Sequence, residues 1–247
     1  VGQALDASGN LYVTGSSCLV NSCDYLTAKI TSIGNVAWSQ VYNGGTYDNA
    51  VGIVLDSSGN AYVTGTSTGP SSDDIVTIKY TSSGSQAWLD RFDSGTNDHA
   101  MAIAAGAGHV YAAGWDFKSG TPDIALISFD PSTGAEQWVK TYDSGAQDLP
   151  TALAVDGSGN VYLTGTIGTV GDHRIVTAMY QPDGANAWLH TYGQSGYDNS
   201  AVRIAVDGSG NVYIAGTVER SSGNTDFVTL RYDSGGTARN AITYDGY

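Results

Sequence analysis

A ten-residue motif recurs along the chain and restricts it to a repeat architecture. Its first copy reads Asp-Ala-Ser-Gly-Asn-Leu-Tyr-Val-Thr-Gly over residues 6–15, and a degraded copy covers residues 106–114. A tryptophan recurs with a 50-residue period, and Asn240 stands in its place in the last copy. Two markers in phase indicate five copies of one structural unit. The other full copies begin at Asp56, Asp156 and Asp207, and the tryptophans are Trp38, Trp88, Trp138 and Trp188.

Each copy has the pattern of four short strands, here called a to d. In the second copy, the turns 56–60 and 82–85 each contain a glycine where a tight hairpin needs a positive φ. The third strand is rich in β-branched and aromatic residues, and no segment has a helical pattern. The four strands of this copy are predicted at residues 50–55, 61–66, 74–80 and 87–92.

One four-stranded sheet of this size cannot bury both of its faces, whereas sheets packed face to face around an axis can. The sequence therefore predicts an all-β propeller of five four-stranded antiparallel blades around a central channel, in a single domain over residues 1–247. Since the chain begins with a strand a and ends after a strand d, we expect blade 1 to close the ring by packing on blade 5. The blades are expected at approximately 1–47, 48–97, 98–147, 148–197 and 198–247.

The repeat resembles that of the bacterial β-propeller family SBBP. The family pattern is Asp-x-x-Gly-Asn-x-Tyr-Val-Thr-Gly, then an Asp that opens the third strand, then Gly and Trp; residues 56–65, Asp74, Gly84 and Trp88 match it. The resemblance covers essentially the whole chain. The family name implies seven blades, so either this propeller has five or these are five copies from a larger array. The resemblance also implies an extracytoplasmic, surface-associated protein and supplies no catalytic residues.

The charge balance limits the choice of partners. Acidic residues number 24 against 10 Lys and Arg, a formal charge of −14, which repels nucleic acids and anionic membrane surfaces. No apolar run reaches the length needed for membrane insertion. Because the chain starts at Val1 without a signal-like segment, we interpret it as a mature form or a fragment of a longer chain or assembly.

The only two cysteines, Cys18 and Cys23, lie in one loop between strands b and c of the first copy. Neither has a patterned histidine nearby, so a zinc site is disfavoured and a disulfide is predicted. A disulfide in turn predicts an oxidising, extracellular or cell-surface location.

A functional surface is expected on the side of the blades that carries the b–c and d–a loops. These loops differ between copies, whereas the a–b and c–d turns are nearly identical. A recurrent acid precedes strand a, and four such acids at a channel mouth would suit Ca²⁺ or a cationic ligand. The alternative is that each acid binds backbone N–H groups of its own d–a loop. These acids are Asp48, Asp98, Asp148 and Asp198.

A second recurrent acid opens strand c and is expected to hold the b–c loop by hydrogen bonds. In the fourth copy Arg174 replaces it. The acids of this series are Asp24, Asp74, Asp123 and Asp226.

Departures from the repeat mark further candidate binding residues. Trp115 and Asp116 stand together in a b–c loop, and an exposed aromatic ring beside a carboxylate is typical of sugar-binding surfaces. The alternative for Trp115 is a cover over the edge of its own blade. Arg203 on strand a is expected either to point toward the axis and neutralise the acids or to cap a blade interface.

No catalytic constellation stands out, and the four histidines lack metal-ligand spacing. We therefore expect no enzyme, no catalytic residue, and no cofactor or metal other than Ca²⁺. The leading hypothesis is a cell-surface binding module for a carbohydrate or a surface protein. The alternatives are a structural spacer of a surface protein or filament and, less favoured, a five-bladed glycosidase, which would need a marked carboxylate pair.

Overall fold

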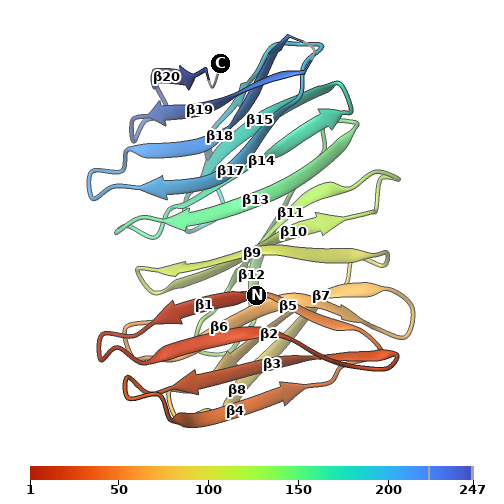
Figure 1. Cartoon of the computed structure of the whole chain (residues 1–247), viewed down its shortest axis with the longest axis vertical. Coiled ribbons are helices and arrows are strands. Elements are labelled where there is room, and N and C mark those ends of the chain that lie inside the picture. The colour runs from red at the N-terminus through yellow and green to blue at the C-terminus, as the bar shows by residue number, and fades with distance from the viewer. Residues whose placement is uncertain (222, 246–247) are drawn as a thin grey trace.

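The computed structural model describes residues 1–221 and 223–245 and contains five four-stranded antiparallel sheets (Figure 1). The described residues form strands, turns and loops with no helix, so none of them forms a helix that could cross a membrane. In every sheet the strand order follows the sequence. The predicted all-β fold with five antiparallel blades is therefore confirmed.

The strand bounds follow the repeat. Blade 1 holds β1 (Gly2–Leu5), β2 (Leu11–Leu19), β3 (Ser22–Ile30) and β4 (Val36–Tyr42). Blade 2 holds β5 (Asp48–Leu55), β6 (Ala61–Thr68), β7 (Asp73–Tyr80) and β8 (Gln86–Phe92). Blade 3 holds β9 (Asp98–Gly106), β10 (His109–Asp116), β11 (Asp123–Phe129) and β12 (Glu136–Tyr142). Blade 4 holds β13 (Gln147–Val155), β14 (Val161–Thr169), β15 (Asp172–Tyr180) and β16 (Asn186–Tyr192). Blade 5 holds β17 (Asn199–Val206), β18 (Val212–Ser221), β19 (Asn224–Tyr232) and β20 (Ala238–Tyr244).

The recurrent Asp-x-x-Gly-Asn segment forms the a–b hairpin turn. In blade 2, Oδ1 of Asp56 accepts hydrogen bonds from the backbone N–H groups of Ser58 (2.9 Å) and Asn60 (3.0 Å). Gly59 has a φ of 75°, a conformation that disfavours other residues. The Tyr62 hydroxyl donates to Oδ2 of Asp56 at 3.0 Å, which links the turn to the core. The motif therefore recurs because it builds the turn and anchors strand b.

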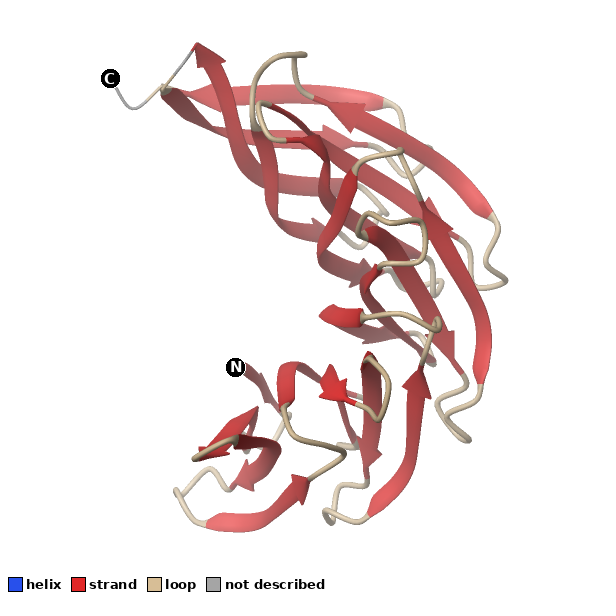
Figure 2. Cartoon of the chain, turned by 90° about the vertical axis from the view of Figure 1, so that its right-hand side faces the viewer, coloured by secondary structure: helices blue, strands red, loops and turns tan. Residues whose placement is uncertain are grey.

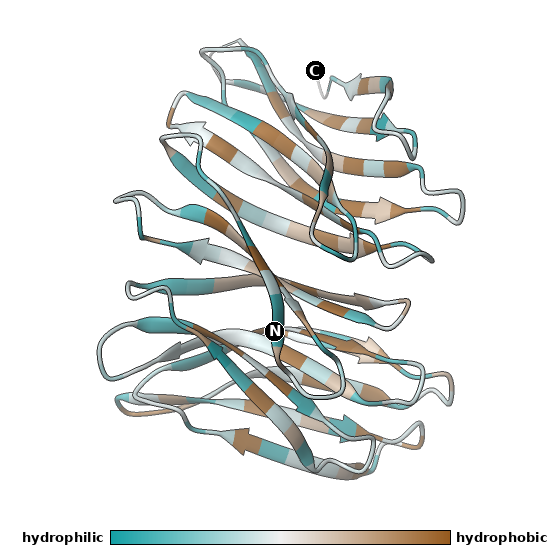
Figure 3. Ribbon diagram, turned by 180° about the vertical axis from the view of Figure 1, so that it is seen from behind, coloured by the Kyte–Doolittle hydropathy of each residue, from teal (hydrophilic) through white to brown (hydrophobic). Residues whose placement is uncertain are grey.

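The recurrent tryptophan and the c–d glycine meet across blade boundaries. Gly84 has a φ of 92°, and a Cβ there would lie 2.6 Å from the ring of Trp38 in the preceding blade. The indole N–H of Trp38 donates to the Ser82 carbonyl at 3.2 Å. The same contact joins Trp88 to Gly134, Trp138 to Gly184 and Trp188 to Gly236. Along the strands, apolar residues (brown in Figure 3) alternate with paler and hydrophilic (teal) ones.

The five blades follow an arc, and the closed ring that the sequence predicts is not seen (Figure 2). The first strands β1, β5, β9, β13 and β17 contact one another in sequence order. Leu26 and Val41 on blade 1 and Phe227 and Ile242 on blade 5 are exposed, although their counterparts inside the arc face a neighbouring blade. In the last copy Asn240 stands in place of the tryptophan that packs on the glycine of the next blade elsewhere, and a Cβ at Gly34 of blade 1 would meet no atom within 4 Å.

The predicted disulfide between Cys18 and Cys23 is confirmed. The two residues are directly opposed in the register of β2 and β3, close to the end of that hairpin. Both strands run further than the sequence predicts, because only Val20 and Asn21 separate them and Asn21 adopts a φ of 70°. A disulfide is compatible with an oxidising compartment.

Candidate functional site

Three of the four acids that precede strand a are buried, and each is bound to its own d–a loop. Oδ2 of Asp98 accepts the backbone N–H of Ser94 at 2.7 Å. Asp48 accepts that of Gly44 in the same way, and Asp148 accepts both the N–H and the hydroxyl of Ser144. These three carboxylates therefore do not line an open channel mouth.

The fourth acid of this series, Asp198, has a different environment. Its side chain is 45% exposed and lies 2.8 Å from Nδ1 of His173. It also accepts the backbone N–H of Gly171 at 2.9 Å. Burial raises the pKa of Asp198, but the hydrogen bonds from His173 and Gly171 and the charge of His173 together lower it below its ordinary value. The four acids thus occupy two kinds of site.

Two of the buried acids join an acid of the strand-c series. Oxygens of Asp74, Asp93 and Asp98 lie within 4.8 Å of one another, and so do those of Asp123, Asp143 and Asp148. The third member of each triad comes from the d–a loop and was missed in the sequence, although Asp93 and Asp143 are also 50 residues apart. Asn43 and Gly193 occupy this position in the other two complete junctions.

In the first triad, the pKa of Asp98 is raised above that of an ordinary aspartate. Burial and, to a lesser extent, the charges of Asp116 and Asp74 raise the pKa of Asp98, hydrogen bonds from Ser94 oppose the rise, and the net value is about 6. Oδ1 of Asp98 is buried and has no hydrogen-bond partner among the described residues. Oxygen atoms in this arrangement are suited to a hard cation such as Ca²⁺.

The second triad has a similar balance. Burial raises the pKa of Asp148, hydrogen bonds from Ser144 lower it, and the charges of Asp123 and Asp143 raise it. Both triads therefore place like charges close together at the loop side of a blade junction.

Arg91 fills the loop side of the junction between blades 1 and 2. Its guanidinium donates to Asp74, to the Tyr42 hydroxyl at 3.1 Å and to the Ser67 hydroxyl at 2.7 Å. The other copies have a shorter residue at this position of strand d, either Val or Thr. The sequence signal for this role is that Arg91 is the only charged residue at this position among the five copies.

Two cavities lie on the loop side of the later junctions. A cavity of ≈ 560 Å³ lies between blades 4 and 5, and one of ≈ 350 Å³ lies between blades 3 and 4. Thr191 of blade 4 lines both cavities. The larger is lined by Thr191, Tyr192, Gly193, Gln194, Asn199, Val218, Glu219 and Arg220.

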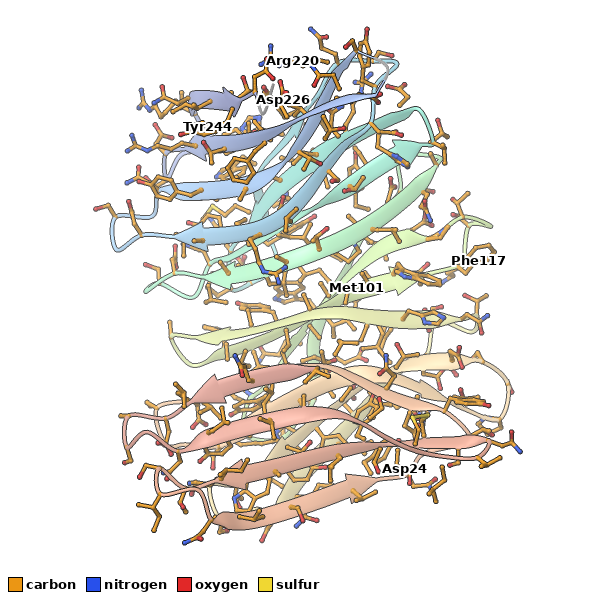
Figure 4. The ribbon with its side chains drawn as sticks, in the orientation of Figure 1. Asp24, Met101, Phe117, Arg220, Asp226 and Tyr244 are labelled. Carbon is orange, nitrogen blue, oxygen red and sulfur yellow. A yellow bond between two sulfur atoms is a disulfide. The ribbon has the colours of Figure 1, made fainter. Side chains whose placement is uncertain are left out.

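The larger cavity combines an aromatic side chain with polar groups of both signs. Backbone N–H groups of Asp198 and Gly223 donate to Glu219 and lower its pKa, so it is an ionised acceptor. Nε of Arg220 lies 3.0 Å from Oδ2 of Asp226, and the two side chains are neighbours at the end of blade 5 (Figure 4). Gln194 is exposed, and its amide has no hydrogen-bond partner among the described residues.

The predicted residues Trp115, Asp116 and Arg203 are not among those that line either of these cavities. Trp115 belongs to β10 and stacks on His99, with ring centroids 4.2 Å apart. Asp116 is buried and accepts the backbone N–H of Lys118 at 3.1 Å. Arg203 lies exposed on β17 and donates to the carbonyl of Val202. The structure therefore does not bring these three residues together.

Asp226 and Arg174, which open strand c in blades 5 and 4, have different surroundings. Asp226 is buried beside Arg220, and one of its oxygens has no hydrogen-bond partner among the described residues. Arg174, which replaces the acid in blade 4, lines the smaller cavity together with Asp172.

Comparison with known proteins identifies the repeat and the fold. Residues 37–70 match the family described as SBBP, beta-propeller repeat, and this segment joins the end of one copy to the beginning of the next. No curated protein sequence matches the chain.

Solved structures share the fold at low sequence identity. Puromycin hydrolase is 14% identical with a TM-score of 0.61, over 99% of this chain and 38% of its own length. A protein from Lactobacillus plantarum is 14% identical with a TM-score of 0.60, over 99% of this chain and 70% of its own. A gluconolactonase from Xanthomonas campestris is 14% identical with a TM-score of 0.47, over 86% of this chain and 67% of its own.

The prediction that the chain is not an enzyme is contradicted, because puromycin hydrolase, a protein named as an enzyme, shares its fold. The physical reason is that the repeat specifies a scaffold, while catalysis depends on loop residues that differ from protein to protein. At 14% identity the likeness shows the fold alone and transfers no activity or residue to this chain.

Proposed function

Since its blades carry the SBBP beta-propeller repeat, we propose that the chain is a binding module whose ligand site is the cavity between blades 4 and 5. The observation that carries this proposal is the cavity of ≈ 560 Å³ at the junction where the repeated acids are lost. Gly193 stands there in place of Asp93 and Asp143, and Asn199 lies at its wall. The volume lies within the range of small-ligand sites.

The chemistry of the cavity favours a carbohydrate. Tyr192 offers an aromatic surface for the C–H groups of a sugar ring. Glu219 supplies an ionised acceptor, and Gln194 supplies a free amide donor and acceptor for hydroxyl groups. Because Thr191 also lines the cavity of ≈ 350 Å³ between blades 3 and 4, the ligand we propose is an oligosaccharide that extends from one junction to the next.

The disulfide supports a location outside the cytoplasm. An exported module at the cell surface would meet polysaccharides there, which is consistent with a site on the variable loop side. We therefore propose that the chain acts as a surface-exposed or secreted glycan-binding propeller.

Glycan-array screening followed by calorimetry tests this proposal. Tyr192→Ala is expected to weaken binding at least tenfold, about 1.4 kcal/mol. Phe92→Ala is the matched control, because Phe92 has the same position in blade 2 but does not line the cavity. The proposal is wrong if the chain binds no glycan, or if both variants weaken binding equally.

A second candidate activity is calcium binding at the two aspartate triads. The buried, unpartnered oxygen of Asp98 is the observation that favours it. Calcium is expected to raise the melting temperature and a chelator to reverse the rise. Asp143→Asn should remove part of this shift, whereas Asp183→Asn, outside both triads, should not; an equal shift in both variants would exclude the triads as the site.

A further inference from the structure

The two ends of the arc present exposed apolar sheet faces. On blade 1, Leu26 is 39% exposed and Val41 is 59% exposed. On blade 5, Phe227 is 47% exposed and Tyr244, labelled in Figure 4, is 56% exposed. Large exposed apolar patches on a soluble domain mark interaction surfaces.

The interfaces inside the arc show what these two faces are built to contact. At each internal junction, the face that carries the strand-b tyrosine and the strand-d tryptophan packs on the c–d turn of the next blade. Nε1 of Trp88 donates to the Pro131 carbonyl at 3.1 Å, and Nζ of Lys79 donates to the same carbonyl at 2.7 Å. At this junction a cationic and an aromatic donor therefore share one turn carbonyl, whereas Ser128 and Met179 hold the position of Lys79 in blades 3 and 4.

Blade 1 presents the receiving half of this contact without an occupant. Gly34 corresponds to Gly84 and has a φ of 88°, but a Cβ at Gly34 would meet no atom within 4 Å. Ser32 holds the position of Ser82 and Pro131, whose carbonyls accept the tryptophan N–H groups. This turn therefore matches the internal turns in sequence and conformation but has no partner above it.

Blade 5 presents the other half of this contact, the face that supplies the hydrogen-bond donors. Arg231 holds the position of Lys79, and its guanidinium lies over the Tyr213 ring at 5.7 Å, as Lys79 lies over Tyr62 at 5.1 Å. Nε of Arg231 is buried and has no hydrogen-bond partner among the described residues. Asn240 holds the position of the tryptophan and provides an amide donor in its place. A buried donor without a partner is costly, and a carbonyl supplied by another blade would satisfy it.

We propose that blade 5 of one copy packs on blade 1 of a second copy, head to tail, in the geometry of the internal junctions. Arg231 and Asn240 then face the Ser32 carbonyl and Gly34 of the second copy. The two faces lie at opposite ends of the arc, so one copy does not satisfy both (Figure 2). Such a contact is heterologous, and copies therefore join into an extending or closed assembly. Because Asn240 buries less surface than a tryptophan, the association is reversible and depends on concentration.

Sedimentation velocity over a wide range of concentrations tests this proposal on the full chain. The unmodified chain is expected to self-associate as its concentration rises. Leu26→Arg on blade 1 and Phe227→Arg on blade 5 should each yield monomers. Mixed together, these two variants should form a one-to-one dimer that grows no further, since each retains one intact face. Met101→Arg is the control, because Met101 is exposed on β9 away from both ends (Figure 4).

Asn240→Trp supplies the missing side chain and is expected to tighten self-association at least tenfold. Three results would each overturn the proposal: a monomer at all concentrations, self-association that survives Leu26→Arg, and a mixture of the two end variants that remains monomeric. The mixture also distinguishes this contact from a symmetric one, in which a face pairs with its own copy.

Discussion

The junction between blades 1 and 2 and the junction between blades 4 and 5 share their packing but differ on the loop side. In both, a tryptophan lies against a c–d glycine, Trp38 on Gly84 and Trp188 on Gly236. On the loop side, Arg91 closes the first junction, whereas the second opens into a cavity of ≈ 560 Å³. The comparison teaches that the repeated residues build the interface, while the residues that vary decide whether a site exists there.

The tryptophan packing that both junctions share has the largest expected effect on the free energy of unfolding. Trp188→Ala should reduce the apparent free energy of unfolding by about 3–5 kcal/mol, because it removes a large buried side chain. Asn240→Ala, at the same position of the exposed last blade, should change it by less than about 0.5 kcal/mol. Urea unfolding followed by tryptophan fluorescence and circular dichroism measures both. Equal losses would show that the tryptophan column does not hold the blades together.

Removing Arg91 from the junction between blades 1 and 2 should have the next largest effect on the free energy of unfolding. Arg91→Thr removes the partner of buried Asp74 and is expected to cost about 2–3 kcal/mol, below the range for a fully buried pair because Arg91 is partly exposed. Arg239→Thr breaks the exposed pair with Asp233 and should cost much less, because solvent screens that pair. Denaturant unfolding compares the two variants. A loss for Arg91→Thr no larger than that for Arg239→Thr would show that Arg91 does not close the junction.

The acid triads give the stability a pH dependence. The pKa of Asp98 is raised in the folded protein to about 6, so folding favours its protonated form. Its contribution is fully present below the ordinary pKa of an aspartate and is lost as the pH rises through about 6. Asp98→Asn should therefore gain on the order of 1 kcal/mol relative to the unmodified chain between pH 4 and pH 7. Thermal unfolding across this range, without calcium, measures the difference; parallel profiles would contradict it.

The disulfide is expected to have the smallest effect. Replacing Cys18 and Cys23 with serine should cost about 1 kcal/mol, because the bond closes a short loop at an exposed hairpin end. Blades 4 and 5 have long b–c hairpins without a disulfide and remain paired. Native-state hydrogen exchange should show faster opening confined to the ends of β2 and β3. Global destabilisation comparable with that of Trp188→Ala would contradict this local role.

The local pattern of the sequence was enough to determine the blades. The Asp-x-x-Gly-Asn turn, the glycines with positive φ and the apolar alternation act over a few residues, so the strands, the hairpins and the disulfide followed from the sequence alone. The recurrence of Trp38 and its successors likewise predicted a packed interface between consecutive copies.

Only the tertiary structure decided what the acids and the loops do. Asp74 and Asp98 belong to two different repeats of the pattern, and they meet Asp93 only because the blade twist and the d–a loop bring their ends together. Arg91 fills the loop side of its junction through a contact with Tyr42 of the preceding blade, whereas Gly193 and Asn199 line a cavity between blades 4 and 5. The open arc likewise depends on how Asn240 and Gly34 are placed in space, since packing between distant copies is a matter of three-dimensional geometry that no local periodicity specifies.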